Sequence, residues 1–150
     1  MTESLKDKDE LWLLTACIWA EARGEPVEGQ EAVCNVIVNQ VRKRMGGNIK
    51  SVILAPFQFS WTIPSDPNFK KVFYAEDKYP QSWNMALMIA QEGIKGELVD
   101  NTMNADHYLN LEATMEARQK AGQTKLLPRW VDMAKVTVKI HNHTFFNLRG

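Results

Sequence analysis

An apolar run at residues 11–20 leads directly into an acidic residue, Glu21. Leu11, Leu14 and Ile18 recur at helical spacing, and one further step of three residues reaches Glu21. The pattern predicts a buried helix over residues 10–23. The last turn of this helix carries a carboxyl group on the side that is otherwise apolar.

The helix has to end just after this carboxyl group. Gly24 suits a helix C-cap, and Pro26 disfavours helical conformation in the residue before it. Burial at this position is expected to raise the pKa of Glu21, and the negative end of the helix dipole acts in the same direction. A carboxyl that stays protonated near neutral pH can serve as a general acid. The same spacing also allows a structural ion pair between Glu21 and Arg23 or a distant base.

The length and the charge of the chain limit the classes of protein to which it can belong. A chain of 150 residues suits one compact domain spanning residues 1–150, of which 1–9 are polar and expected to be flexible. The 18 basic and 18 acidic residues balance, so the basic excess of a nucleic-acid-binding protein is missing. The balance also argues against strong attraction to an anionic membrane.

Both cysteines, Cys17 and Cys34, lie in apolar helical patterns, and we expect buried free thiols. Their spacing matches no zinc motif. The apolar run at 11–20 is too short to cross a bilayer, and mixed charges at 6–10 precede it, unlike a signal peptide. We therefore expect synthesis in a reducing cytoplasm without an export signal.

The remaining pattern predicts an α+β fold, mainly helical with a small antiparallel sheet. We expect further helices at residues 28–44, 83–95 and 111–121, with a short helical turn at 51–54. Ser82 is the expected N-cap of the third of the four long helices. Residues 55–62 are expected to form an extended loop or short strand, and 62–80 an irregular connection. Alternating residues from 136 onward predict a terminal β-hairpin that turns near Asn142.

Several blocks of this sequence resemble one known family. The blocks are WAEARGEP at 19–26, EGQEAV at 28–33, NQV at 39–41, QFSW at 58–61, HYLN at 107–110, Trp130 and IHNHTFF at 140–146. In this order they are similar to the catalytic domain of the spore-cortex-lytic (SleB-type) cell wall hydrolases. Cys34 departs from the small aliphatic residues common at its position, and the segment 62–80 does not align.

The resemblance implies a lysozyme-like fold and cleavage of the β-1,4 bond between N-acetylmuramic acid and N-acetylglucosamine in peptidoglycan. It also implies that Glu21 is the single catalytic acid/base of a lytic transglycosylase, which forms 1,6-anhydro products. A hydrolytic muramidase would need a second carboxyl group. Asp106, Glu25 and Glu28 are the candidates for that carboxyl, and the sequence leaves the two mechanisms open.

The same resemblance suggests which residues bind the substrate: Glu25, Gln58, Ser60, Trp61, His107, Tyr108 and Asn110. Each has a structural alternative. Glu25 also suits ordering of the turn, and Ser60 is a candidate to hydrogen-bond Glu21 or a simple loop hydroxyl. Trp61 and Tyr108 suit sugar stacking or the core, and Asn110 suits N-acetyl binding or helix N-capping.

Three other residues of these blocks are expected to be structural. Arg23 is interpreted as the partner of an acid, Trp130 as a core residue and His143 as part of the hairpin turn.

Two rival functions remain possible from the sequence alone. The first is a zinc amidase or peptidase that uses His107, His143 and a carboxylate, although no HExxH spacing occurs. The second is a wall-binding module without activity, for which an acid at the end of an apolar stripe is a poor design.

The sequence also leads to expectations about the cellular setting and the binding partners of this protein. The absence of a signal peptide and of a separate wall-binding domain is more typical of a phage endolysin released from the host cytoplasm than of a spore enzyme. We expect a monomer that binds peptidoglycan glycan strands, with no cofactor, no metal, no nucleic acid and no membrane insertion.

Overall fold

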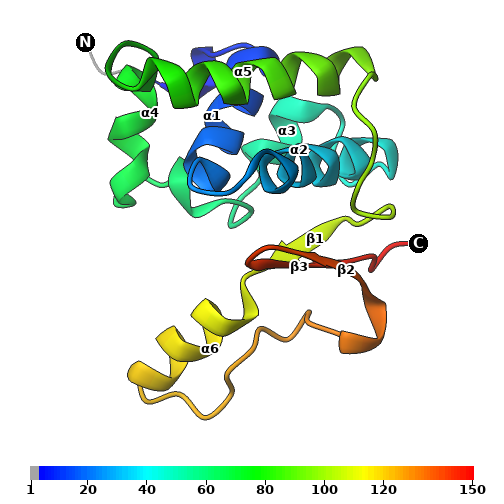
Figure 1. The fold of residues 1–150 in the computed structure, drawn as a ribbon. Helices are drawn as coiled ribbons and strands as arrows, with labels where there is room; N and C mark the ends of the chain where they lie inside the picture. The colour runs from blue at the N-terminus through cyan, green and yellow to red at the C-terminus, as the bar shows by residue number, and fades with distance from the viewer. Residues whose placement is uncertain (1–3) are drawn as a thin grey trace.

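The computed structural model describes residues 4–150 and shows two lobes (Figure 1). The helical lobe contains α1 Glu10–Ala22, α2 Val27–Arg42, α3 Ile49–Ile53, α4 Pro67–Lys78 and α5 Pro80–Lys95. The small lobe contains β1 His107–Leu109, α6 Leu111–Lys120, β2 Val136–Ile140 and β3 His143–Phe146. The predicted fold class, mainly helical with a small antiparallel sheet, is confirmed.

Helix α1 is the centre of the helical lobe. Asp9 caps its start by accepting a hydrogen bond from the backbone N–H of Trp12 at 2.8 Å. Every residue from 13 to 19 is buried, because α2, α3, α4 and α5 all contact this helix. The sequence predicted an apolar stripe, but the helix is enclosed on all sides. The two cysteines are buried and free, as expected.

Helix α2 joins the two lobes. Val33 and Ile37 belong to the main core, whereas Ala32 and Val36 pack with Phe145 of β3 in a second, smaller core. This second core contains the contact between α2 and the sheet. It therefore fixes where the small lobe lies relative to the helices.

Most of the segment 62–80 is helix α4, Pro67–Lys78, and not the irregular connection that the sequence suggested. The carboxylate of Asp66 accepts a hydrogen bond from Asn68 N at 2.8 Å, and Pro67 occupies the first turn of α4. Val72 and Ala75 then enter the core. Residues 55–62 form turns and a 3-10 helix, Ser60–Thr62, so the alternative of a short strand was wrong.

Helix α5 begins earlier than expected, at Pro80, with Tyr79 and not Ser82 at its N-cap. The Ser82 hydroxyl instead accepts a hydrogen bond from Trp19 Nε1 at 2.8 Å, which satisfies the polar atom of a buried indole. Ala86, Ile89 and Ala90 are buried as expected.

The sheet has the strand order β1-β3-β2, and both pairings are antiparallel. Tyr108 pairs with Phe145 in β1 and β3, and Ile140 pairs with His143 beside the hairpin turn. The predicted hairpin with a turn near Asn142 is confirmed, and His141 adopts a left-handed φ of 53° there. The turn brings His143 back toward Tyr108.

The chain's first residues are only partly described. The expectation of flexibility at residues 1–3 falls outside the described part. Within it, Leu5–Asp7 form a 3-10 helix, and the Leu5 side chain is buried.

A close helix contact provides a test of the fold. A Cβ atom at Gly93 of α5 would lie 2.5 Å from Cys34 Sγ, and both residues are buried. We predict that Gly93→Ala lowers the free energy of unfolding by about 1–3 kcal/mol through overpacking. We also predict that adding Cys34→Ala restores part of the loss. Urea unfolding measures both effects.

The matched control is Gly24→Ala, because a Cβ atom at Gly24 would meet nothing within 4 Å. A Gly93→Ala protein as stable as the wild type would contradict the packing described for α2 and α5.

Candidate active site

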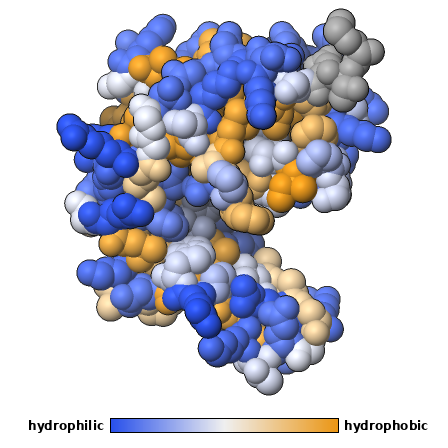
Figure 2. Space-filling view, turned by 180° about the vertical axis from the view of Figure 1, so that it is seen from behind, coloured by the Kyte–Doolittle hydropathy of each residue, from blue (hydrophilic) through white to orange (hydrophobic). Residues whose placement is uncertain are grey.

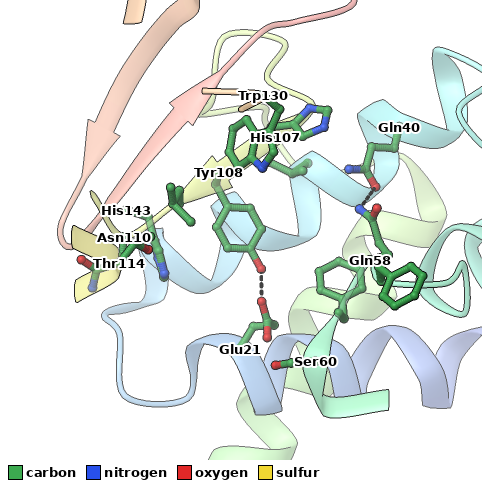
Figure 3. Close-up of a pocket in the computed structure, with 14 residues that line it drawn as sticks. Glu21, Gln40, Gln58, Ser60, His107, Tyr108, Asn110, Thr114, Trp130 and His143 are labelled. Atoms are coloured by element: carbon green, nitrogen blue, oxygen red, sulfur yellow. Dashed lines mark hydrogen bonds between the residues drawn. The ribbon is translucent and has the colours of Figure 1, made fainter. Parts of the chain in front are cut away.

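A groove of about 550 Å³ lies between the two lobes. Figure 2 shows the surface hollowed between the larger and the smaller lobe. Figure 3 shows Glu21 in the groove, with residues of the small lobe facing it. The lining residues are Glu21, Val36, Gln40, Phe57, Gln58, Phe59, Ser60, His107, Tyr108, Leu109, Asn110, Thr114, Trp130 and His143.

Glu21 lies in the last turn of α1 and is the sole carboxyl among the described residues that line this groove. Burial raises its pKa above the ordinary value of 4.5, and the charge of Asp66 acts in the same direction. A hydrogen bond from Tyr108 lowers the pKa, but burial outweighs it. The predicted upward shift in pKa is therefore present, and the predicted ion pair with Arg23 is not.

Tyr108 reaches Glu21 from the opposite lobe. Its hydroxyl donates a hydrogen bond to Glu21 Oε1 (Figure 3). Burial, with the nearby carboxyl of Glu21, raises the pKa of the phenol well above 10, so the group stays a donor near neutral pH. The rings of His143 and Phe145 pack against the tyrosine at centroid distances of 5.1 and 5.7 Å and fix its direction.

Asp106 is not a second acid in the groove. Its side chain is wholly buried, 2.9 Å from Lys43 Nζ and 2.8 Å from His107 Nδ1. It also accepts hydrogen bonds from the backbone N–H groups of Leu148 and Arg149, each at 2.9 Å. Burial alone would raise its pKa, but these partners outweigh it and lower the pKa to about 2. Asp106 anchors the C-terminal segment and His107.

Glu25 holds the hairpin turn. Its carboxylate lies 3.3 Å from His143 Nδ1 and accepts a hydrogen bond from Asn142 at 3.4 Å. Burial lowers the pKa of His143, although Glu25 opposes the shift. Glu25 does not line the groove, which favours its alternative role in ordering a turn. His143 lies beside the hairpin turn, as expected, and also lines the groove.

The two tryptophans lie in different environments. Trp61 is 1% exposed and lies in the main core, so the core alternative holds for it and the sugar-stacking one does not. Trp130, expected in the core, lines the groove and packs against His107 at 5.1 Å and Phe146 at 5.4 Å. An indole suits both environments, and the sequence around each residue does not distinguish them.

The other predicted binding residues, Gln58, Ser60, His107 and Asn110, line the groove. Gln58 donates a hydrogen bond to Gln40 Oε1 at 3.4 Å. Asn110 caps α6 by accepting a hydrogen bond from Ala113 N at 3.0 Å. Ser60 lies near Glu21 (Figure 3), but the hydrogen bond to Glu21 comes from Tyr108 instead.

Arg23 was expected to pair with an acid, but its partners are carbonyl groups and an amide oxygen. Its guanidinium donates to the carbonyl groups of Trp19 and Ala20 and to Asn68 Oδ1, and it stacks over the Trp19 ring. The Trp19 carbonyl already accepts a hydrogen bond from the backbone N–H of Arg23, and the guanidinium adds a second bond there and one to Ala20 at the helix end.

Sequence reasoning missed the amide groups of α2. Asn35, Asn39 and Gln40 are buried and donate hydrogen bonds to the carbonyls of Val99, Ala105 and Asp106, at 3.0, 2.9 and 2.7 Å respectively. These bonds fasten the segment that leads into β1. Three amides at helical spacing on an apolar helix were the available signal.

Among the described residues 4–150, no three His, Cys, Asp or Glu side chains gather as metal ligands would. His107 instead hydrogen-bonds Asp106, and His143 lies apart from it, 3.3 Å from Glu25. Within the same residues, no helix has both the length and the apolar character needed to span a bilayer.

Comparisons with known proteins show the family and the fold of this chain. The family model Hydrolase_2, described as Cell Wall Hydrolase, matches residues 24–146, and the chain therefore belongs to the cell wall hydrolase family. The crystal structure of the catalytic domain of the Bacillus cereus SleB protein has the same fold, with a TM-score of 0.62 and 22% sequence identity. That alignment covers 98% of this chain and 94% of the other. No curated protein sequence matches significantly.

The Asp106 cluster predicts a specific loss of stability. Asp106→Asn leaves Lys43, which is only 7% exposed, without its countercharge. We expect a loss of about 3–5 kcal/mol in the free energy of unfolding at pH 7. Because the pKa of Asp106 is lower in the folded state, its contribution is present above pH 3.8 and is lost as the pH falls toward about 2.

Urea unfolding across this pH range measures the effect. The control is Asp77→Asn, at an exposed position of α4. If Asp106→Asn and Asp77→Asn have the same effect, the anchoring role assigned to Asp106 is wrong.

The contact between the lobes gives a second prediction. Tyr108→Phe removes the donor that stabilises the Glu21 carboxylate, so the pKa of Glu21 should rise further. An NMR titration of the Glu21 side-chain carboxyl measures this shift. The control is Tyr74→Phe, at an exposed position of α4. An unchanged or lowered pKa in Tyr108→Phe would show that the phenol does not hold this carboxyl.

Proposed function

We propose that this cell wall hydrolase cleaves the β-1,4 bond between N-acetylmuramic acid and N-acetylglucosamine as a lytic transglycosylase, with Glu21 as the single acid/base. The observation that carries the proposal is that Glu21, with its raised pKa, is the sole carboxyl among the described residues lining the groove. A transglycosylase needs one carboxyl group, because the sugar itself supplies the nucleophile.

In the first step, protonated Glu21 donates its proton to the glycosidic oxygen. The bond from that oxygen to C1 of the muramic acid breaks, and the N-acetylglucosamine side leaves with a free hydroxyl. The raised pKa of Glu21 favours the protonated form, from which the proton is donated. The N-acetyl group of the muramic acid can stabilise the positive charge that develops at C1.

In the second step, the C6 hydroxyl of the same muramic acid attacks C1 and closes a 1,6-anhydro ring. Its proton passes to the Glu21 carboxylate, which returns the enzyme to its starting state. The Tyr108 hydroxyl stabilises the carboxylate between the two steps, because it donates to Oε1. Burial favours the acid form and Tyr108 favours the base form, so a single group serves both steps.

A hydrolytic muramidase is the alternative, and the candidates for its second carboxyl do not support it. A retaining enzyme needs a second carboxyl about 5 Å away, and an inverting one about 6.5–9.5 Å away with water between. Asp106 is bound on both oxygens, and Glu25 is bound to the hairpin turn. Neither Glu25 nor Glu28 lines the groove.

The glycan strand would be held by polar and aromatic groups from both lobes. Gln58 and Ser60 come from the helical lobe, and His107, Trp130 and Asn110 come from the small lobe. Amide and imidazole groups suit the hydroxyl and N-acetyl substituents of the sugars, and an indole suits their apolar faces. The endolysin context expected from the sequence stays a prediction.

The test is Glu21→Gln, which keeps the side-chain shape but cannot donate the proton. We expect muropeptide release from purified peptidoglycan to fall by about 10²–10⁴-fold, with no loss of folding. Mass spectrometry of the wild-type digest should show muramic acid ends lighter by one water than hydrolytic ends.

Glu76→Gln on the exposed side of α4 is the matched control. Normal release by a folded Glu21→Gln protein would reject the role of Glu21. Reducing muramic acid ends in the wild-type digest would reject the transglycosylase mechanism in favour of hydrolysis.

A further inference from the structure

We propose that Phe57 is a sugar-stacking residue at the helical-lobe rim of the groove, where its ring binds the apolar face of an N-acetylhexosamine. This inference rests on the proposed function, because it takes the occupant of the groove to be a glycan strand. Phe57 lies just before the QFSW block that the sequence comparison singled out, and it has no role in the chemistry described above.

The backbone at Phe57 is strained for a phenylalanine. Gln58 N donates to the Ala55 carbonyl at 3.2 Å, which closes a tight turn over Pro56 and Phe57. Phe57 adopts a left-handed φ of 63°. A proline followed by a residue of positive φ is the pattern of a type II turn, in which glycine is favoured at the second of these positions. A bulky side chain there carries a conformational cost.

Packing does not compensate for this cost. Phe57 is 97% exposed, which is the largest exposure among the exposed large hydrophobic residues described. An aromatic ring in open solvent contributes little to the core, and a non-glycine residue held in a sparsely populated conformation points to a functional role. The stability of the fold therefore does not explain why a phenylalanine occupies this turn.

The position of the ring explains it better. Phe57 lines the same groove as Glu21, and the next residue, Gln58, is directed into the groove and bonded to Gln40 (Figure 3). Ser60, three residues further on, lies near Glu21 in the same view. One short loop thus supplies a ring, an amide and a hydroxyl to a single groove, and leaves the ring free to be covered by ligand.

The chemistry of the ligand fits a ring of this kind. One face of a pyranose exposes mainly C–H groups, which pack against the negative face of an aromatic ring, while the hydroxyl and N-acetyl groups at the edge bind polar partners. Gln58 beside the ring offers such a partner. Phe57 would therefore bind one of the sugars of the strand held in the same groove as Glu21.

The experiment separates binding from folding by the choice of variant. Phe57→Gly removes the ring and also relieves the strained φ, whereas Phe57→Tyr keeps an aromatic face. In the inactive Glu21→Gln background, we expect Phe57→Gly to weaken binding of soluble chito-oligosaccharides about tenfold. We expect its melting temperature to be equal to or above that of the parent. Phe57→Tyr should bind within about twofold of the parent on the same reasoning.

Tyr74→Ala is the matched control, because Tyr74 is an exposed aromatic residue on α4 outside the groove. It should leave binding unchanged. Calorimetry measures the affinities, and thermal unfolding measures the stability of each protein.

Two results would overturn the inference: unchanged sugar binding by Phe57→Gly, or a fall in its melting temperature that accompanies the loss of binding and shows a structural role. The proposed function has a separate test that does not depend on residue 57. Continued muropeptide release by the Glu21→Gln protein would reject that function.

Discussion

The burial of one carboxyl group is the constraint on which this structure depends. Helix α1 is enclosed by four other helices, and Glu21 lies where that helix reaches the groove. Removing a carboxylate from water is costly, and the result is a raised pKa. Tyr108 supplies a hydrogen bond that makes the ionised form tolerable. Burial therefore favours the acid form of Glu21, and the hydrogen bond from Tyr108 favours the carboxylate.

The arrangement works only if the small lobe is held in register with the helical lobe. The amides of α2 bind the backbone before β1, and the small core around Phe145 packs on the same helix. Asp106 then ties the C-terminal residues and His107 to Lys43. Tyr108 lies between these anchors and is positioned by them. Helix α2 therefore holds the two lobes in the relative position that forms the groove.

The sequence predicted the elements with strong local signals and missed those that depend on tertiary contacts. The periodicity of α1 and the alternation of the hairpin strands were sufficient to predict both elements, and Asn110 takes the capping role that was one of its two alternatives. Residues 62–80 were misread because Asp66 and Pro67 suit a loop as well as a helix start. Trp61 was left between core and groove, and Trp130 was misplaced in the core, because burial depends on the partners of an indole, which one sequence does not show. The blocks shared with the family predicted most of the residues that line the groove, but not which of these residues contact one another.

The most direct measurement of the central claim is a crystal structure of the Glu21→Gln protein with a bound glycan fragment that contains the scissile bond. The account predicts the glycosidic oxygen within about 3 Å of the residue 21 side chain, with the muramic acid C6 hydroxyl facing C1 and no carboxylate on the opposite side of the sugar. A glycan bound outside the groove, or a second carboxylate positioned across C1 with water between, would contradict it.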